Sequence, residues 1–151
     1  MSSITSKPAR LHTGHAAGVR AIADVAERWV ATLGVVLCSV QIGLAALGFW
    51  GANLHPGNEA ADRAAFAPHA MMGSVLQWVS IALLILGLIA LSNWKSWVLP
   101  LIAGVLLWLV QGPLVGLGFS VSIWFGFAHA VSGTVITAAL VWLMVDRWKH
   151  R

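Results

Sequence analysis

Two histidines stand out because they lie in otherwise apolar sequence and share their neighbours. His69 begins HAMMGSVL and His129 begins HAVSGTVI, so the two residues are 60 positions apart. Ionisable side chains within membrane spans are costly and usually functional. Two neutral imidazoles that approach from opposite sides supply the axial nitrogens of a hexacoordinate haem iron. The pair therefore predicts a bis-histidine site, with His69 and His129 as axial ligands of a haem b iron.

Small residues near the histidines would make room for the porphyrin. Gly73 and Gly133 each follow a histidine by four residues, which removes one side chain about one helical turn away. Gly126 and Ser122 would extend the same gap. The predicted cofactor-binding residues are therefore the two histidines and the three glycines.

The two histidines are also compatible with roles that involve no haem. Both rings could be buried donors that bond to neighbouring carbonyls or to Gln41, Gln77 or Gln111. Another cofactor or metal is a further alternative, although zinc is disfavoured because its structural sites normally have four protein ligands. A proton relay has little support, since no carboxylate or cation accompanies either ring in its span.

The elements that must position these residues are membrane-spanning helices. The 151 residues are 59% hydrophobic and 9% charged, with a mean hydropathy of +0.84. Soluble domains average about 45–50% apolar and about 25% charged residues, so an ordinary soluble domain is excluded and lipid is the expected surrounding. The single cysteine, Cys38, cannot form an intrachain disulfide and indicates no redox compartment.

The distribution of charge predicts four spans. Residues 29–58, 64–94 and 96–145 contain no Asp, Glu, Lys or Arg. A span needs about 20 apolar residues, so the third stretch holds two. We expect helices at roughly 29–50, 66–92, 97–118 and 121–145, with a kink at Pro113. Because backbone groups in lipid must be satisfied within the chain, the fold class is all-α, an integral membrane four-helix bundle.

Basic residues predict the orientation. Eight of the nine Lys and Arg residues lie before the first span, between the second and third, or after the fourth, and only Arg63 lies on the other side. By the positive-inside rule both termini are cytoplasmic in a multi-pass protein of the cell inner (plasma) membrane. The predicted domains are a basic tail at 1–28, the bundle at 29–146 and a tail at 147–151. The net charge of +4 then reflects topology, and no nucleic-acid partner is expected.

The chain shows an internal repeat. Residues 41–50 read QIGLAALGFW and residues 111–120 read QGPLVGLGFS, and the two histidine segments match as well. This pattern predicts a duplicated helical hairpin whose copies are related by a pseudo-twofold axis along the membrane normal. Chance similarity among spans rich in Leu, Gly and Ala is the alternative.

Stripes of small and polar residues at helical spacing should face the bundle interior. The clearest stripes are Gly34, Cys38, Gln41, Ala45 and Gly48 in the first span, His69, Gly73, Gln77 and Ser80 in the second, and Ser122, Gly126, His129, Gly133 and Thr137 in the fourth. Gly112 and Gly116 form a G-x-x-x-G pattern that indicates one more helix contact. His55, in the outer loop, is interpreted as part of a solvated connection; covering a cofactor edge or binding a partner is the alternative.

Residues 30–146 resemble one four-helix half of the haem A synthase family, in which each half carries a histidine on its second and fourth helices. The resemblance rests on FAPHAMMGSVL, VQGPLVGLGF and FGFAHAVSGTVI. The chain is also similar to small uncharacterised four-helix membrane proteins. It departs from the family at Phe66 and Ala70, where a Glu and an Arg are common, and it lacks the outer cysteine pair. One bundle also implies one haem site, so the resemblance favours electron transfer or haem handling over monooxygenation.

The expected function is that of a bis-histidine b-type cytochrome in electron transfer or haem handling near the outer face. Its expected partners are the lipid bilayer and either a membrane protein complex or a second copy in a homodimer. The main alternative is a non-enzymatic accessory or assembly subunit of a larger membrane complex, in which the histidines only form hydrogen bonds within the bundle. A lipid- or carotenoid-binding module is a third interpretation, suggested by nine tryptophans among many glycines.

Overall fold

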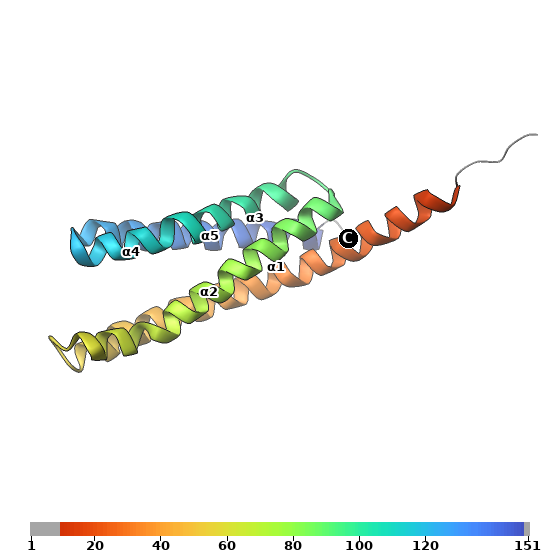
Figure 1. Ribbon diagram of the computed structural model, residues 1–151. Coiled ribbons are helices and arrows are strands. Elements are labelled where there is room, and N and C mark those ends of the chain that lie inside the picture. The colour runs from red at the N-terminus through yellow and green to blue at the C-terminus, as the bar shows by residue number, and fades with distance from the viewer. Residues whose placement is uncertain (1–9, 150–151) are drawn as a thin grey trace, which may run out of the picture.

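The computed structural model describes residues 10–149, and side chains from residue 16 onward. Every regular element is helical, as Figure 1 shows, which confirms the predicted all-α class. In chain order the elements are α1 (Arg10–Asn53), α2 (Glu59–Ala90), α3 (Lys95–Val105), the π-helix η1 (Leu106–Val110), α4 (Gln111–Ser120) and α5 (Ile123–Lys149).

Four helical rods form the molecule, because α3, η1 and α4 follow one another without a break. The rods Ala16–Asn53, Glu59–Ala90, Lys95–Ser120 and Ile123–Lys149 are each long and apolar enough to cross a membrane. The prediction of a multi-pass four-helix bundle is thereby confirmed. The first helix is longer than expected, since α1 begins at Arg10, within the predicted tail, and extends beyond the other rods (Figure 1).

The third rod is irregular immediately before its proline. The Gln111 amide donates to the Leu106 carbonyl, five residues back, so η1 is a wide π turn. Pro113 has no N–H, and its ring would clash with the carbonyl of Leu109 in a regular α-helix. The sequence predicted a kink at Pro113, and the structure places the distortion in the turn that precedes it.

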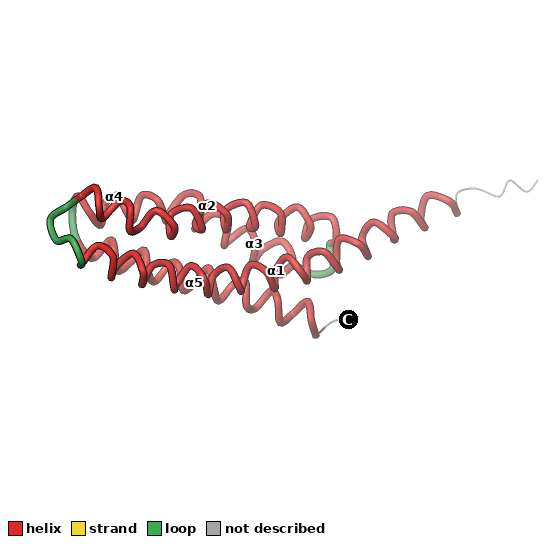
Figure 2. The backbone as a smooth tube through the Cα atoms, turned by 90° about the horizontal axis from the view of Figure 1, so that it is seen from below, coloured by secondary structure: helices red, strands yellow, loops and turns green. Residues whose placement is uncertain are grey.

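Short connections join the rods. Both the 54–58 loop and the α4–α5 junction lie at the end of the bundle away from the C-terminus, as Figure 2 shows. Asn58 caps α2 by accepting hydrogen bonds from the Ala60 and Ala61 amides. At the other end α2 closes with Leu91 in a left-handed conformation, and the carbonyl of Ser96 lies where Gly87 would carry a side chain.

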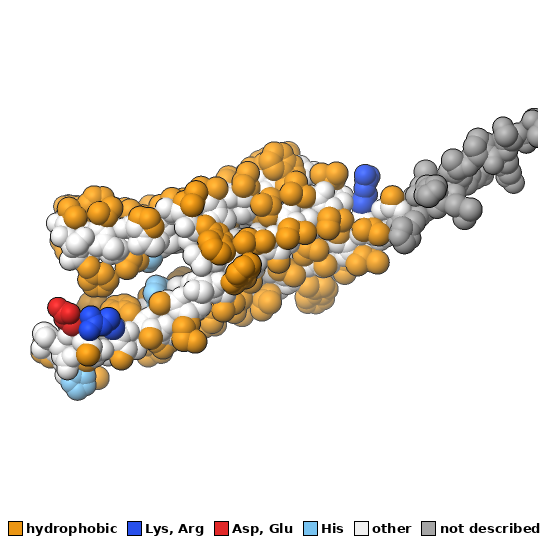
Figure 3. Space-filling model, viewed as in Figure 1, with side chains coloured by type: hydrophobic (Ala, Val, Ile, Leu, Met, Phe, Trp, Pro, Cys, Tyr) orange, Lys and Arg blue, Asp and Glu red, His pale blue; other side chains and the backbone are white. Residues whose placement is uncertain are grey.

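The bundle is packed tightly over only half of its length. The buried core consists of Ala31, Cys38, Leu76, Leu83, Leu99, Ala103, Leu107, Ile136, Ala139, Leu140 and Leu143. We call this the closed half, comprising residues 23–38, 76–107 and 136–147. In the open half, residues 42–75 and 111–135, Gly48 is the one buried residue. Figure 3 shows the resulting opening between two arms, with histidine side chains on either side of it.

Candidate functional site

The structure brings the two predicted ligands together where the arms separate. His69 on α2 and His129 on α5 have ring centroids 6.2 Å apart, with an angle of 64° between the ring planes. Both residues are half-buried. They come from different hairpins and face each other across the bundle.

A backbone carbonyl holds each ring in the same way. His69 Nδ1 lies 3.2 Å from the Gln41 carbonyl oxygen, and His129 Nδ1 lies 3.3 Å from that of Gln111. A carbonyl can only accept a hydrogen bond, so both rings carry their proton on Nδ1. The lone pair of each neutral imidazole is then on Nε2, the arrangement that orients and strengthens metal-ligating histidines.

The side chains of the two glutamines behave differently. The Gln41 amide nitrogen lies 3.4 Å from His69 Nε2, and no hydrogen bond reaches its buried Oε1 in the described part of the chain. The Gln111 amide instead donates to Ser132 Oγ at 2.7 Å and to the His129 carbonyl at 3.2 Å. The Gln41 side chain therefore contacts Nε2 of His69, whereas the Gln111 side chain is bonded to Ser132 and to the His129 carbonyl.

Two of the predicted glycines lie beside these glutamines. A Cβ atom added to Gly73 would be 3.6 Å from the Gln41 amide nitrogen, and one added to Gly133 would be 3.6 Å from that of Gln111. Both distances are ordinary van der Waals contacts, so packing within the chain does not require glycine at either position. The missing side chains leave space that a ligand in the opening could use.

The third predicted glycine, Gly126, has open space beside it, because an added Cβ atom would meet nothing within 4 Å, and the close packing at this point depends on Gly118. A Cβ atom on Gly118 would lie 3.1 Å from the Gly126 amide nitrogen, so α4 and α5 approach closely at this point. Phe66 stands 60 positions before Gly126 and packs against Gly48 in the first hairpin. The Phe66 ring also contacts the His69 ring edge-on, with centroids 6.5 Å apart.

Two further residues considered in the sequence lie away from the histidine pair. Gln77 donates to the Leu107 carbonyl at 3.0 Å, and its own carbonyl accepts hydrogen bonds from Ser80 and Trp108, so it ties α2 to the third rod. His55 lies in the exposed 54–58 loop, where its carbonyl accepts from the Asn58 amide.

Sequence reasoning missed an ion-pair network in the closed half. Arg147 on α5 donates to Asp24 on α1 at 2.8 Å and to Asp146 at 2.9 Å, and Lys95 pairs with Asp146. Asn93 donates to Asp146, which adds the α2–α3 turn to the network. The signal that could have found it was the charge distribution, because three of the five acidic residues lie at this end together with most cations.

Glu27 is the anomalous member of this network and lies just before the charge-free span that begins at residue 29. It is 0% exposed, and neither carboxylate oxygen accepts a hydrogen bond within the described residues. The nearest cation is Arg147, whose Nη1 atom is 3.6 Å from Glu27 Oε2. Burial raises the pKa of Glu27 from 4.5 to about 7, against the opposing effect of Arg147.

The pKa of Asp146, which follows the last charge-free span, is shifted in the opposite direction to that of Glu27. Burial acts to raise its pKa, but hydrogen bonds from Lys95, Arg147 and Asn93 outweigh burial. The pKa of Asp146 is therefore held well below its usual range.

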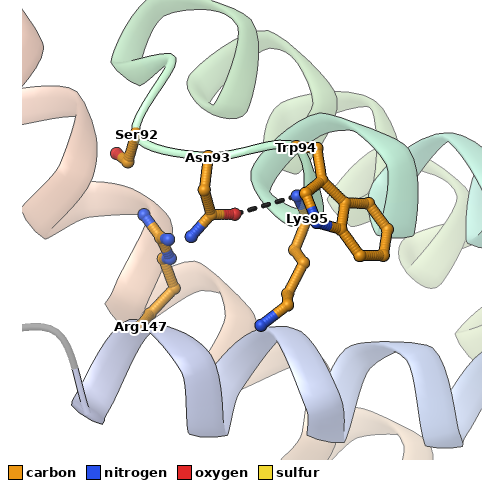
Figure 4. A pocket seen from close by; sticks show the side chains of 5 residues that line it. All are labelled: Ser92, Asn93, Trp94, Lys95 and Arg147. Carbon is orange, nitrogen blue, oxygen red and sulfur yellow. Dashed lines mark hydrogen bonds between the residues drawn. The ribbon is translucent and has the colours of Figure 1, made fainter.

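A cavity of about 450 Å³, lined mainly by residues with polar side chains, adjoins this network. Figure 4 shows its lining residues, Ser92, Asn93, Trp94, Lys95 and Arg147, with Asn93 accepting a hydrogen bond from the Lys95 amide. Its two cations are already paired with acidic side chains. We therefore regard it as part of the structural network and not as the main site.

The two histidine rings lie 6.2 Å apart within an opening that has glycines along its sides, and the Gln41 amide contacts Nε2 of His69. The chain matches no protein-family model, no curated protein and no solved structure. The chemistry of the pair is therefore judged on its own geometry.

Proposed function

We propose that this protein binds haem b between His69 and His129 and acts in one-electron transfer or haem handling in a membrane. The observation that carries the proposal is the facing pair of imidazoles, each with Nδ1 bonded to a glutamine carbonyl. When bound, haem would supply a single iron centre for electron transfer. The chain would supply the two axial nitrogens and their fixed tautomers.

The spacing of the rings suits a shared metal. Bonds from histidine nitrogen to a metal such as zinc are about 2 Å long, so two opposed bonds place the nitrogens about 4 Å apart. The ring centroids are 6.2 Å apart. About 2 Å therefore remains for the two distances from each coordinating nitrogen to the centroid of its own ring. No group of three or more His, Cys, Asp or Glu residues is placed to hold a metal within residues 16–149. Two protein ligands fit a porphyrin, which brings its own four nitrogens.

A duplicated hairpin is part of the same proposal, and recurring contacts support it. Gly34 packs against Leu140, and Gly104 packs against Ser80. Gly104 lies 70 positions after Gly34, and Leu140 lies 60 positions after Ser80. The two contacts between a histidine ring and a glutamine carbonyl are related in the same way, because Gln111 lies 70 positions after Gln41 and His129 lies 60 positions after His69. A pseudo-twofold axis between the hairpins accounts for both pairs of contacts.

We further propose that the closed half faces the cytoplasm and that both termini lie there, in the plasma membrane. Two edge-on tryptophan pairs, Trp29 with Trp148 and Trp94 with Trp142, lie at this end. Arg28 and Lys95 each place a cation over one of these rings. Tryptophans with basic neighbours are typical of the cytoplasmic membrane interface. The open half and its histidines would then face outward.

Absorption spectroscopy of the detergent-purified protein, expressed with ample haem, tests the proposal. We expect a Soret band and the low-spin spectrum of a bis-histidine haem. That bis-histidine spectrum should be lost in both His69→Ala and His129→Ala. His55→Ala is the matched control, because that histidine lies in the exposed loop, and it should leave the spectrum unchanged. A colourless wild-type protein, or an unchanged spectrum in both ligand variants, would contradict haem ligation.

A role as a non-enzymatic accessory subunit is the second candidate, and one observation favours it. A Cβ atom on Gly112 or Gly116 would meet nothing within 4 Å, so their G-x-x-x-G face of α4 is unpacked. Such faces allow close contact between membrane helices. Gly116→Leu should then abolish association with a second copy or another subunit in detergent, whereas Gly18→Leu, an equally open position in α1, should not.

A further inference from the structure

We propose that His69 is the displaceable ligand of the pair, because the Gln41 side chain competes for its Nε2 atom, and that a small iron ligand such as carbon monoxide binds on the His69 side. This inference rests on the proposed haem site. It assigns different roles to two histidines that the sequence pattern presents as equivalent.

Gln41 satisfies both nitrogens of the His69 ring. Its backbone carbonyl accepts from Nδ1 at 3.2 Å, and its side-chain amide lies 3.4 Å from Nε2. In contrast, no hydrogen bond reaches His129 Nε2 within the described residues, although its Nδ1 contacts the Gln111 carbonyl at 3.3 Å. The lone pair of His129 is therefore available for coordination, whereas that of His69 is shared with an amide.

A single sequence difference accounts for this asymmetry. The Gln111 amide is held by Ser132 Oγ at 2.7 Å and by the His129 carbonyl. The position 60 residues before Ser132 is Met72, which has no hydroxyl to offer Gln41. The Gln41 amide turns to the ring instead, and its Oε1 remains buried without a hydrogen bond in the described part of the chain.

Competition at one nitrogen determines which ligand leaves. Whenever His69 releases the metal, the Gln41 amide can take the freed lone pair, which stabilises the dissociated ring. His129 has no such competitor, so its bond should persist. The exchange breaks one coordinate bond from His69 Nε2 and forms one from carbon monoxide, with no electron transferred. The proton stays on Nδ1 throughout.

Titration of the reduced, haem-loaded protein with carbon monoxide tests this proposal. In Met72→Ser, a hydroxyl holds the Gln41 amide as Ser132 holds that of Gln111. We expect the affinity for carbon monoxide to fall about fivefold, the effect of one hydrogen bond. Gln41→Leu should give a fall of similar size. Gln111→Leu is the matched control and should change the affinity by less than about twofold.

The single-histidine variants give a second readout. His69→Ala should retain haem in a five-coordinate state that binds carbon monoxide readily, whereas His129→Ala should lose most of its haem. In the haem-free protein, ¹⁵N NMR should show a hydrogen-bonded Nε2 in His69 but not in His129, and Met72→Ser should remove that difference.

The outcomes separate this inference from the proposed function. Absence of any haem spectrum would overturn both, although NMR would still report the Gln41 bond. Normal haem binding with equal carbon monoxide affinities in wild type, Met72→Ser and Gln41→Leu would overturn the inference and leave the haem site standing. Retention of haem by His129→Ala together with its loss from His69→Ala would reverse the assignment.

Discussion

The closed and open halves of the bundle are built from the same kinds of apolar helix but are held together differently. In the closed half, leucines pack against small residues, and ion pairs join α1, α5 and the α2–α3 turn. In the open half, the side-chain hydrogen bonds between helices in the described part of the chain come from the histidines and their glutamines, and glycines such as Gly48 and Gly118 allow close helix contacts. The comparison indicates that stability resides mainly in the closed half, and that the arms of the other half are held together less tightly.

Removal of Arg147, the cation shared by three carboxylates of the closed half, should lower the free energy of unfolding by the largest amount. Arg147→Ala would leave Asp24, Asp146 and Glu27 without their shared partner, and breaking a buried ion pair in this way costs about 3–5 kcal/mol. Thermal denaturation in detergent should show a large fall in the unfolding temperature. Arg63→Ala, at an exposed ion pair of the open half, should cost less than about 1 kcal/mol. Equal effects of the two variants would remove the distinction between the halves.

The buried carboxyl of Glu27 should make stability depend on pH. Its pKa is raised in the folded protein from 4.5 to about 7, so between these values the folded state binds more protons than the unfolded state. The free energy of unfolding should therefore fall as the pH rises from about 4.5 to about 7, by up to about 3 kcal/mol.

Glu27→Gln removes this titration and should be more stable than wild type at pH 8, with little difference at pH 4.5. Unfolding measured across this range tests the prediction. An unchanged pH dependence in the variant would show that Glu27 is not the titrating group.

Two glycine variants compare the space available in the two halves. Gly87→Ala would push a methyl group into the Ser96 carbonyl at the α2–α3 turn. We expect a loss of about 1–3 kcal/mol, typical of overpacking, because backbone atoms must move. The unfolding temperature should fall, and tolerance of alanine at this position would contradict the close approach.

The corresponding substitution in the open half should have the smallest effect on stability. In Gly133→Ala, the new Cβ atom makes only an ordinary contact with Gln111, and alanine is a better helix former by up to about 1 kcal/mol. The haem-free variant should therefore unfold at the same temperature as wild type or slightly higher. Its affinity for haem should fall if a macrocycle lies against this turn, which a haem titration would reveal.

Features within single helices were predictable from the sequence, and contacts between helices were much less so. Charge-free runs located all four spans, because a bilayer-crossing helix needs a continuous apolar segment. The facing of His69 and His129 followed from matching rare residues at one offset. The repeat itself and the orientation of the termini stay predictions.

The remaining features depend on geometry that residue types do not encode. The sequence analysis included Gln41 and Gln111 among the possible hydrogen-bond partners of the rings, but only the geometry shows that the acceptors are their backbone carbonyls. The burial of Glu27 depends on where α5 crosses α1, and its acidic character alone suggested an exposed tail. The separation of the arms likewise arises from the packing of whole helices.

The wide turn η1 lies where the third rod leaves the closed half and enters the open one. Before it, Gly104 packs against Ser80 of α2, and after it, Gln111 and Gly118 contact α5. α5 is a neighbour of both sections, since Lys95 of α3 pairs with Asp146, whereas α2 packs mainly against the first section. The two sections are joined by five residues that are unwound relative to an α-helix. Because α5 runs unbroken from the open half into the buried core, α4 can move away from α2 at this joint only if α5 bends as well. Widening of the opening for a bulky planar guest would therefore involve both the wide turn of the third rod and the continuous helix α5.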